Sequence, residues 1–254
     1  MLSYQHAYHA GNAADLHKHA TLAELIARLT AKPRGLAYAE THAGRGLYRL
    51  DAPEALKTGE AAEGVGRAEP APDTPYGRAL AAARAAHGPA AYPGSPLIAR
   101  SLLRPQDSLT LMELHPAEHA ALRGALKGPG LAVHRRDGYE GLIALAPLAP
   151  RRGLVLVDPS YEVKTEYAAA ADFARRLLAK WPEAAVLIWY PLLPAGRHAE
   201  LLAGLGPLPF LRDEVAFARP PERGMTGSGL ALVNAPHGAG AAFAAARALA
   251  GVFA

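Results

Sequence analysis

The sequence has no cysteine in its 254 residues, and this absence excludes disulfide bonds, zinc sites with thiolate ligands and a cysteine nucleophile. It also lacks an uncharged apolar run that approaches the roughly 20 residues of a membrane-spanning helix. Residues 1–6 lack the apolar core of a secretory signal peptide. We therefore expect a cytoplasmic protein without a membrane segment.

The chain has no strong excess of charge, since its net charge is +4 and its pI about 9.4. This mildly basic balance favours an anionic partner such as RNA or DNA. Arginine is abundant beside alanine, glycine and proline, as in proteins from GC-rich genomes, so composition alone does not identify a nucleic-acid-binding protein. The length fits one large domain or a domain with an insertion.

The apolar run Gly153–Val157 leads directly into Asp158-Pro159-Ser160-Tyr161. A short run of valine and leucine between glycine and proline predicts a buried strand of a parallel sheet. Ligands bind beyond the carboxyl ends of such strands, so Asp158 and Tyr161 should overlook a crevice. An acidic acceptor, the Pro159 carbonyl and an aromatic ring suit a planar group with an exocyclic amine, such as adenine. The alternative is an ordinary strand-to-loop turn, with Asp158 solvated and Tyr161 packed.

The remaining patterns predict helices and strands in regular alternation. Asn12 is a suitable N-cap for a helix over residues 13–31, with Asp15 as its capping-box partner. Further strands are expected at residues 36–40, 108–112, 131–134, 184–189, 210–218 and 229–234, and helices at 76–87, from 95, at 116–127, after 138, and at 165–180, 197–205 and 240–252. This order predicts an α/β fold with a mostly parallel sheet and helices on both faces.

A glycine turn at residues 41–46 follows the first expected strand and suits a nucleotide-like ligand. The helix that should come next begins only at Ser95, which we expect to be its N-cap. We therefore predict that residues 49–92 form a helical insertion. Residues 1–48 and 93–254 would form the main domain, with residues 1–12 as a tail or lid.

Four acids stand at or near expected strand ends: Glu40, Glu113, Asp137 and Asp158. An acid after the second strand of a nucleotide-binding fold commonly binds ribose hydroxyls, which suits Glu113. Asp137, near the third strand end, could accept a hydrogen bond from the adenine amine of a cofactor. Each acid alone could be a solvated loop residue, but their equivalent positions favour one shared pocket.

Histidines are concentrated near the N-terminus, and with Asp15 they could suggest a metal site. However, His17 and His19 point to different faces of a helix, and nothing else nearby has ligand spacing. We expect no metal. A lid over the site that carries Tyr4 and His6 is the favoured interpretation.

Asp158-Pro159-Ser160-Tyr161 resembles the Asp-Pro-Pro-Tyr motif of amino-methyltransferases that use S-adenosylmethionine. Longer segments resemble the RlmJ family of 23S ribosomal RNA adenine-N6 methyltransferases. These are residues 2–6, 9–12, 15, 18–19, 41–46, 92–100, 113–116, 189–191 and 223–229, so the resemblance covers nearly the whole chain. Two positions depart from the family pattern: Ser160 replaces the second proline, and Glu40 stands where the family has aspartate.

The resemblance implies a Rossmann-like class I methyltransferase that methylates one adenine of 23S ribosomal RNA. The cofactor would be S-adenosylmethionine, the RNA would be protein-free or an early assembly precursor, and a monomer is favoured. By motif, the cofactor-binding residues would be His19, His42, Ser95, Glu113, Asp137 and Gly138, the catalytic residue Asp158, and the substrate-binding residues Tyr4, His6, Lys18, Pro159 and Tyr161. The base would be extruded into the site, with Tyr161 and Tyr4 stacking on it.

Basic residues near the expected strand ends could grip RNA phosphates, or they could be solubilising surface charges. They are Lys18, Arg45, Arg135, Arg136, Lys164, Arg219 and Arg223. Three rival functions remain open: a DNA adenine or cytosine methyltransferase, a non-catalytic nucleotide- or RNA-binding module, and an NAD-dependent dehydrogenase. The last has little support, because the glycine turn lacks the third glycine of a dinucleotide fingerprint.

Overall fold

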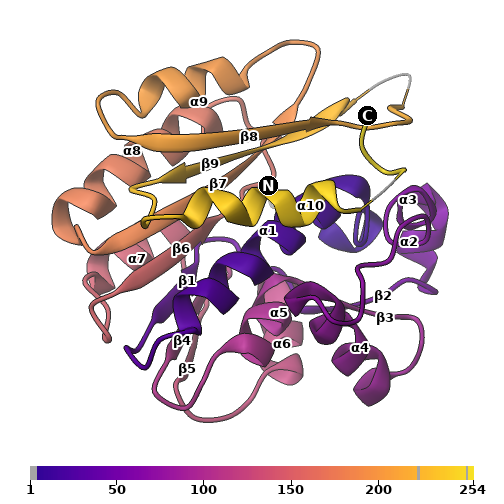
Figure 1. Cartoon of the computed structure of the whole chain (residues 1–254), viewed down its shortest axis with the longest axis horizontal. Coiled ribbons are helices and arrows are strands. Elements are labelled where there is room, and N and C mark those ends of the chain that lie inside the picture. Colours follow the sequence, from indigo (N-terminus) through magenta and orange to yellow (C-terminus); the bar gives the residue numbers. More distant parts are fainter. Residues whose placement is uncertain (1–4, 222–223, 250) are drawn as a thin grey trace.

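The computed structural model describes residues 5–221, 224–249 and 251–254 (Figure 1). Its main sheet has seven strands in the order β5-β4-β1-β6-β7-β9-β8. They are β1 (Ala37–Glu40), β4 (Ser108–Met112), β5 (Leu131–His134), β6 (Gly153–Val157), β7 (Ala184–Leu192), β8 (Phe210–Ala216) and β9 (Gly227–Val233). The first five in this order pair in parallel, whereas β9 is antiparallel to both β7 and β8. The prediction of a mostly parallel α/β fold is therefore confirmed.

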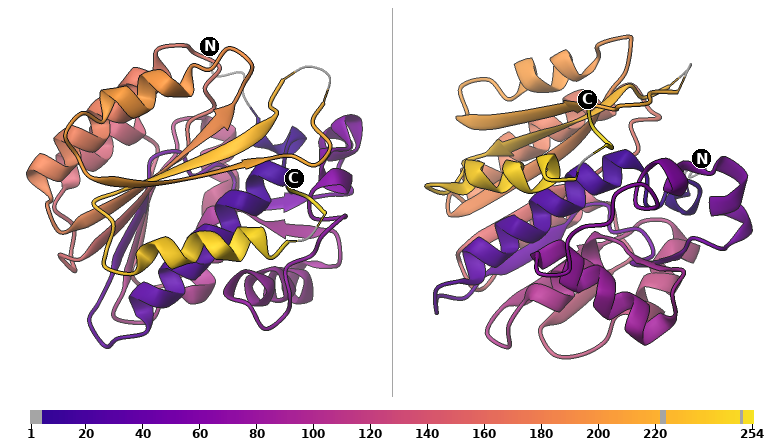
Figure 2. Two further views of the ribbon diagram at one scale, coloured as in Figure 1. Left: turned by 45° about the horizontal axis from the view of Figure 1, so that its top comes forward. Right: turned by 45° about the vertical axis from the view of Figure 1, so that its right-hand side comes forward.

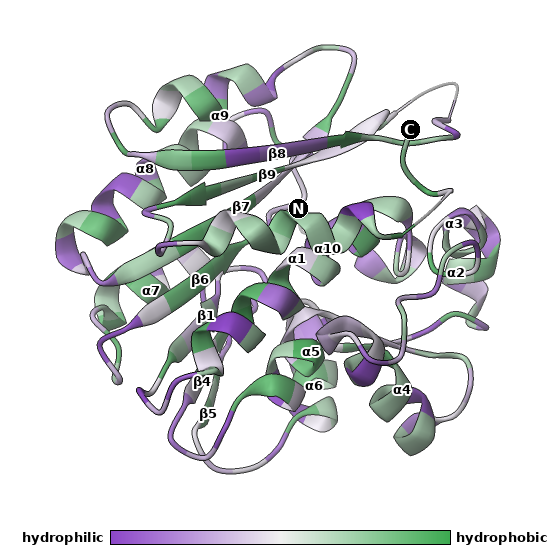
Figure 3. Ribbon diagram, in the orientation of Figure 1, coloured by the Kyte–Doolittle hydropathy of each residue, from purple (hydrophilic) through white to green (hydrophobic). Residues whose placement is uncertain are grey.

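Helices cover both faces of this sheet (Figure 2). One face carries α1 (Ala13–Thr30), α5 (Ser95–Leu102), α6 (Pro116–Ala125), η2 (Ala239–Phe243) and α10 (Ala244–Arg247); the other carries α7 (Gly138–Leu145), α8 (Glu166–Lys180) and α9 (His198–Gly204). Side chains of β6 alternate between the two cores, with Val155 in one and Leu154 and Leu156 in the other. Because both faces are covered, the central strands are largely apolar (Figure 3), with Glu40 at the end of β1 as an exception.

Helix α1 begins where the sequence predicts, because the Asn12 side chain accepts a hydrogen bond from the Asp15 amide at 2.9 Å. The reciprocal bond of a capping box is absent from the described hydrogen bonds, since the Asp15 carboxylate accepts from the Gly11 amide instead. Leu22 and Ile26 of α1 are fully buried against the sheet. This packing brings the first turns of α1 to the carboxyl ends of the strands.

The chain between β1 and α5 contains α2 (Pro53–Thr58), α3 (Glu60–Glu63), α4 (Pro75–His87) and a small antiparallel pair, β2 (Leu47–Arg49) with β3 (Ala91–Pro93). It lies to one side of the main sheet (Figure 1). Its apolar side chains, among them Tyr48 and Tyr92, pack against Ala7 and Ala10 around the short helix η1 (His6–Tyr8). The helix predicted at residues 76–87 is confirmed as α4. Strands β2 and β3 were not predicted, because three residues are too few to show an alternating pattern.

Two predictions at helix ends are wrong. Gly94, not Ser95, occupies the N-cap of α5, and the Ser95 hydroxyl donates to Glu40 Oε2 at 2.8 Å. The expected helix at residues 240–252 is replaced by η2 and α10, which end at Arg247. After them the chain pairs with the end of β8, where the Ala218 amide bonds to the Val252 carbonyl, so tertiary contacts take the backbone groups that a longer helix would use.

Tyr4 and Arg223 lie outside the described residues. Within the described ranges, no helix is long and apolar enough to cross a membrane.

Candidate active site

A cavity of about 940 Å³ lies at the carboxyl ends of the parallel strands. Its walls come from the loops after β1, β4, β5 and β6, from β7, from the first turns of α1, from α2–α3 and from the segment before β9. The described residues that the motifs assign to cofactor, substrate or catalysis all line it: His6, Lys18, His19, His42, Ser95, Glu113, Asp137, Gly138, Asp158, Pro159 and Tyr161. Of the four acids expected in one pocket, Glu40 does not line it, because it is fully buried. Side chains from the whole length of the chain therefore converge on one space.

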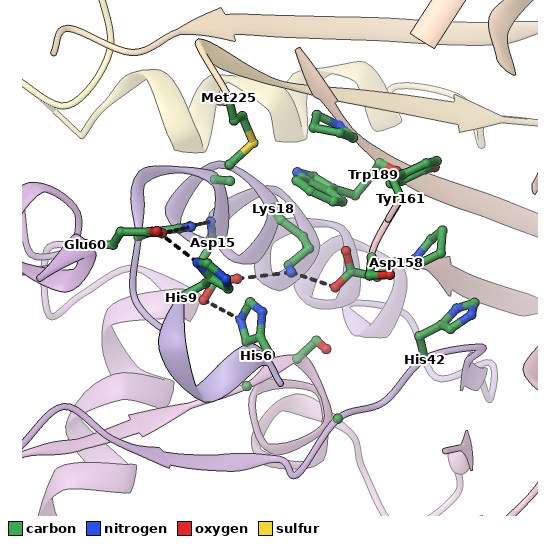
Figure 4. A pocket seen from close by; sticks show the side chains of 18 of the residues that line it. His6, His9, Asp15, Lys18, His42, Glu60, Asp158, Tyr161, Trp189 and Met225 are labelled. Carbon is green, nitrogen blue, oxygen red and sulfur yellow. Dashed lines mark hydrogen bonds and ion pairs between the residues drawn. The ribbon is translucent and has the colours of Figure 1, made fainter. Parts of the chain in front are cut away.

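Lys18 joins two carboxylates in this cavity (Figure 4). Its Nζ lies 2.6 Å from Asp158 Oδ2 and 3.0 Å from Asp15 Oδ1. Burial acts to lower the pKa of Lys18, but attraction to Asp158 and Asp15 outweighs it and raises the pKa above its ordinary value. Lys18 is therefore a cation that holds Asp158 at the end of β6. Among the described residues, none donates a hydrogen bond to Asp158 Oδ1, so this oxygen can accept one from a ligand.

Asp15 is a central residue of the site, although the sequence predicted it as a capping-box partner and not as a site residue. Its carboxylate contacts Lys18, the Gly11 amide at 2.9 Å and His6 Nε2 at 3.0 Å. Burial acts to raise its pKa, but the His6 ring and the Lys18 ammonium hold the pKa well below its ordinary value. Asp15 thus fixes both the N-terminal turn and the lysine. The sequence offered one sign of this role: Asp15 stands three and four residues before Lys18 and His19, a spacing that places the three side chains on the same side of a helix.

Two histidines of the site stay neutral near pH 7. Burial lowers the pKa of His19 to about 3 and that of His42 to about 4. His19 Nδ1 lies 3.0 Å from the Tyr92 hydroxyl, and His42 Nδ1 lies 2.8 Å from the Thr41 hydroxyl. Because neither ring carries a charge, a cationic ligand beside them is not repelled.

Glu113 holds the glycine turn after β1. Its Oε2 accepts from the Gly44 amide at 2.8 Å and its Oε1 from the His115 amide at 2.7 Å. Gly44 has a φ of +61°, and a Cβ there would lie 2.5 Å from the Tyr48 hydroxyl oxygen. Glycine is therefore required for the turn to bring its backbone against the cavity.

Glu40, one strand away from Asp158, is fully buried between two hydroxyl donors, Tyr38 at 2.7 Å and Ser95 at 2.8 Å. Burial raises the pKa of Glu40 to about 8, although both hydroxyls lower it. The carboxyl therefore keeps its proton in the folded protein near pH 7. In the unfolded chain it ionises near 4.5.

We expect this difference to make stability fall as pH rises. Between about 4.5 and 8 the folded state binds more protons at Glu40 than the unfolded state, so the free energy of unfolding decreases across that window. Glu40→Gln has no proton to lose and can still bond both hydroxyls. Urea denaturation should show the wild type losing stability relative to this variant as pH rises. If the difference in free energy of unfolding between the two proteins did not change with pH, Glu40 would not be protonated in the folded state.

The aromatic side chains beside Asp158 differ in their surroundings. Tyr161 has a left-handed backbone (φ 57°), is 7% exposed, donates its hydroxyl to the Trp189 carbonyl at 2.7 Å and packs against Tyr167 with ring centroids 4.4 Å apart. Trp189 also lines the cavity, and Lys18 Nζ lies 5.5 Å from its ring centroid. Trp189 was not predicted as a site residue, although it opens the motif Trp189-Tyr190-Pro191.

The segment between β1 and α5 contributes one wall through Glu60. Glu60 bonds His9 Nδ1 at 2.9 Å and Asn12 Nδ2 at 2.9 Å, which fastens α3 to the N-terminal turn. Sequence reasoning missed this contact because 48 residues separate Asn12 from Glu60. Arg219 and Met225, from the segment before β9, also line the cavity.

The basic residues proposed to grip phosphates are in different environments. Arg45 makes a bidentate ion pair with Glu118, at 2.9 and 2.6 Å, whereas Arg135, Arg136 and Lys164 are exposed. Among the residues that the structure describes, no group of three or more His, Asp or Glu side chains is arranged to hold a metal ion.

Comparison with known proteins shows a likeness along nearly the whole chain. The profile of a family described as ribosomal RNA large subunit methyltransferase D, RlmJ, matches residues 33–247. Proteins named ribosomal RNA large subunit methyltransferase J from Escherichia coli and Haemophilus influenzae are each 38% identical, over 93% of this chain and 88% of theirs. A crystal structure of a Legionella pneumophila protein has a TM-score of 0.81 and 33% identity, covering 93% of this chain and 91% of that one.

Proposed function

Because the chain belongs to the RlmJ family of ribosomal RNA large subunit methyltransferases, we propose that it transfers the methyl group of S-adenosylmethionine to the N6 amine of one adenine in 23S ribosomal RNA. The observation that carries this proposal is Asp158, held by Lys18 in the wall of a cavity of about 940 Å³. That volume is near the upper end of ordinary ligand sites, roughly 300–1,000 Å³, and suits two reactants.

The residues on the β1, β4 and β5 side of the cavity fit S-adenosylmethionine. They would be His19, His42, Ser95, Glu113, Asp137 and Gly138. The rings of His19 and His42 are neutral and Glu113 is acidic, which suits a cofactor with a sulfonium and an ammonium group. Nearby, the buried Tyr139 hydroxyl has no described hydrogen-bond partner and can donate to a ligand. When bound, the cofactor supplies the electrophilic methyl group.

The opposite side of the cavity suits the adenine amine. That amine is a weak nucleophile because its lone pair is delocalised into the ring. Asp158 Oδ1 and the Pro159 carbonyl can accept its two hydrogens, which localises the lone pair and stabilises the developing positive charge. The excess proton then passes to Asp158 or to water. A base in a stacked helix cannot reach this depth, so it must be extruded.

We further propose that residues 49–92 form a subdomain that closes one side of the site, with residues 1–12 as a lid. The contacts from Glu60 to His9 and Asn12 support this arrangement, because they join the two parts directly. The RNA would enter between this subdomain and the segment with Arg219. We favour a monomer that acts on protein-free RNA or an early assembly precursor.

Gly138→Ala is expected to weaken S-adenosylmethionine binding by roughly 10- to 100-fold, because small displacements at a positioned site cost this much. A Cβ at residue 138 would lie 1.9 Å from the Thr41 carbonyl oxygen, so the start of α7 must move away from the loop after β1. Calorimetric titration measures the change. Gly124→Ala in α6 is the matched control, because its Cβ would meet nothing within 4 Å. If both variants bound S-adenosylmethionine equally well, the proposal that the cofactor binds beside Gly138 would be wrong.

Methyl transfer from labelled S-adenosylmethionine tests the proposed function. Protein-free 23S RNA should be labelled, and nuclease digestion followed by mass spectrometry should find N6-methyladenosine. The main alternative is a DNA adenine or cytosine methyltransferase, because the Asp-Pro-x-Tyr motif is shared. Labelling of DNA instead of RNA would establish that alternative, whereas mass spectrometry of 23S RNA from a strain lacking the protein should show one methyl group missing.

A further inference from the structure

Strand β7 places the indole of Trp189 in the cavity beside the catalytic carboxylate. Lys18 Nζ lies 5.5 Å from the indole centroid and 2.6 Å from Asp158 Oδ2, so the ring and the carboxylate flank one cation (Figure 4). Both residues line the cavity, at the ends of adjacent strands. A planar group whose amine faced Asp158 would therefore be close to the face of this ring.

The orientation of Trp189 is fixed from behind by a buried hydrogen-bond chain. Its indole N–H donates to Ser228 Oγ on β9 at 2.9 Å. Ser228 Oγ is 2.8 Å from His17 Nδ1, and His17 Nε2 is 3.1 Å from Asp213 Oδ2 on β8. Arg247 in turn pairs with Asp213. These hydrogen bonds link β7, β9, β8 and α1, and the three side chains in the middle, Ser228, His17 and Asp213, are buried.

Only one placement of the protons gives every donor in this series of hydrogen bonds an acceptor. Asp213 is an acceptor, so His17 donates through Nε2 and accepts at Nδ1, as a neutral imidazole can. Ser228 then donates to His17 and accepts from Trp189. Burial also lowers the pKa of His17, which favours the neutral ring. Every donor has one acceptor, and the indole is held in one orientation.

A serine, a histidine and an aspartate in contact could also suggest a hydrolase. Ser228 and His17 are both 0% exposed, and neither lines the cavity. The hydroxyl is engaged on both sides, by His17 and by Trp189. A substrate has no access to it, so this group supports other residues and does no chemistry itself.

Tyr161 is the other aromatic residue that could contact a base. One side of its ring is covered by Tyr167, its hydroxyl is engaged by the Trp189 carbonyl, and it is 7% exposed. The indole of Trp189 also has neighbours, with Lys18 Nζ 5.5 Å from its centroid and the Tyr161 ring at a centroid distance of 5.9 Å. However, Trp189 is more exposed than Tyr161, its ring is larger, and its N–H is held by Ser228. Trp189 is therefore the better stacking surface of the two.

We propose that Trp189 is the surface on which the target base stacks while its amine faces Asp158, and that Ser228 and His17 are positioning residues that act through Trp189. This inference rests on the proposed function for the identity of the base. Stacking on an aromatic side chain is sequence-tolerant and its loss lowers affinity by roughly 10- to 100-fold. Trp189 would therefore hold the base, while Asp158 selects its amine.

Steady-state kinetics with protein-free 23S RNA test the proposal. Trp189→Leu should lower kcat/KM for RNA by roughly 10- to 100-fold, whereas Trp189→Phe, which keeps a ring, should retain most of the activity. S-adenosylmethionine affinity should be unchanged in both variants. Activity of Trp189→Leu within twofold of wild type would overturn the stacking role.

A double-mutant cycle separates positioning from a general structural role. Ser228→Ala should lower kcat/KM in the wild-type background but cause no further loss in the Trp189→Leu background. The same loss in both backgrounds would show that Ser228 does not act through Trp189. His17→Gln should behave like Ser228→Ala; if it does not fold, Ser228→Ala still decides, because that change removes one oxygen atom and leaves the backbone undisturbed.

Tryptophan emission provides a readout that does not depend on catalysis. The chain has two tryptophans, so Trp181→Phe leaves Trp189 as the sole emitter. In that background, Ser228→Ala should shift the emission maximum and intensity of Trp189, and an unchanged spectrum would overturn the positioning role. If Trp181→Phe does not fold, the difference between the wild-type and Trp189→Phe spectra gives the Trp189 emission, and the same difference measured in the Ser228→Ala background shows whether that emission changes. Absence of RNA methylation by the wild type would instead refute the proposed function and leave this spectral result interpretable.

Discussion

Asp158→Ala is expected to lower the rate of methyl transfer to RNA by about 10³-fold or more, while S-adenosylmethionine still binds. The carboxylate is the acidic acceptor at the end of β6, and loss of both the acceptor and a proton route typically costs about 10²–10⁴-fold. The proposed cofactor-binding residues lie on other elements, in α1, α5 and α7 and in the loops after β1, β4 and β5, so cofactor binding should not depend on this carboxylate. Single-turnover methylation with labelled cofactor measures the rate, and calorimetry measures cofactor binding.

Two variants sharpen this result. Asp158→Asn keeps a carbonyl acceptor and loses the negative charge, so its activity should lie between wild type and Asp158→Ala. Asp172→Ala removes an exposed carboxylate on α8 that pairs with Arg175, and it should leave methylation unchanged. RNA methylation that survives in Asp158→Ala would refute the mechanism and would favour a different residue as the acceptor.

Lys18→Met is expected to destabilise the protein by about 3–5 kcal/mol and to abolish most of the activity. Removing one partner of a buried ion pair leaves an uncompensated charge, which is far more costly than the pair is worth. Here two carboxylates lose their shared cation: Asp15, 1% exposed, and Asp158, 16% exposed. Urea denaturation gives the free energy of unfolding, and the methylation assay gives the activity.

Arg28→Met is the matched control for Lys18→Met, because Arg28 lies on the same helix in an exposed ion pair with Glu24. Exposed pairs contribute about 0–1 kcal/mol, so this variant should be nearly as stable as wild type. Adding Asp158→Asn to Lys18→Met should recover part of the lost stability, since one of the two unpaired charges is then removed. Equal stability of Lys18→Met and Arg28→Met would show that the buried lysine does not organise the site.

Much of the fold follows from local patterns. Helix α1 has an N-cap at Asn12 and a periodic apolar face, and β6 is a short apolar run between glycine and proline, so both could be predicted. Strands β2 and β3 have three residues each, and each residue pairs with one 42 to 46 positions away in the sequence, which leaves no local signal. The C-terminal helix is shorter than its alanine content suggests, because contacts with β8 compete for its backbone.

The site was predictable where a residue follows a strand and not where its role depends on distant partners. Asp158 and Glu113 stand at strand ends, and both line the cavity. Ser95 carries the signature of a cap, but its hydroxyl bonds Glu40, 55 residues earlier. Asp15 satisfied a capping pattern, which concealed its contact with Lys18. Distant contacts of this kind are absent from local sequence patterns.

Helix α1 sends three consecutive side chains to three separate parts of the molecule. His17 bonds Ser228 and Asp213, Lys18 bonds Asp158, and His19 bonds Tyr92. Successive helical residues are about 100° apart, so these three directions are set by a single rotation of the helix about its axis. One residue inserted between Asn12 and His17 would turn all three side chains away from their partners together. The rotation of this one helix about its axis therefore determines whether the proposed cofactor wall, amine acceptor and base-stacking surface are formed at the same time.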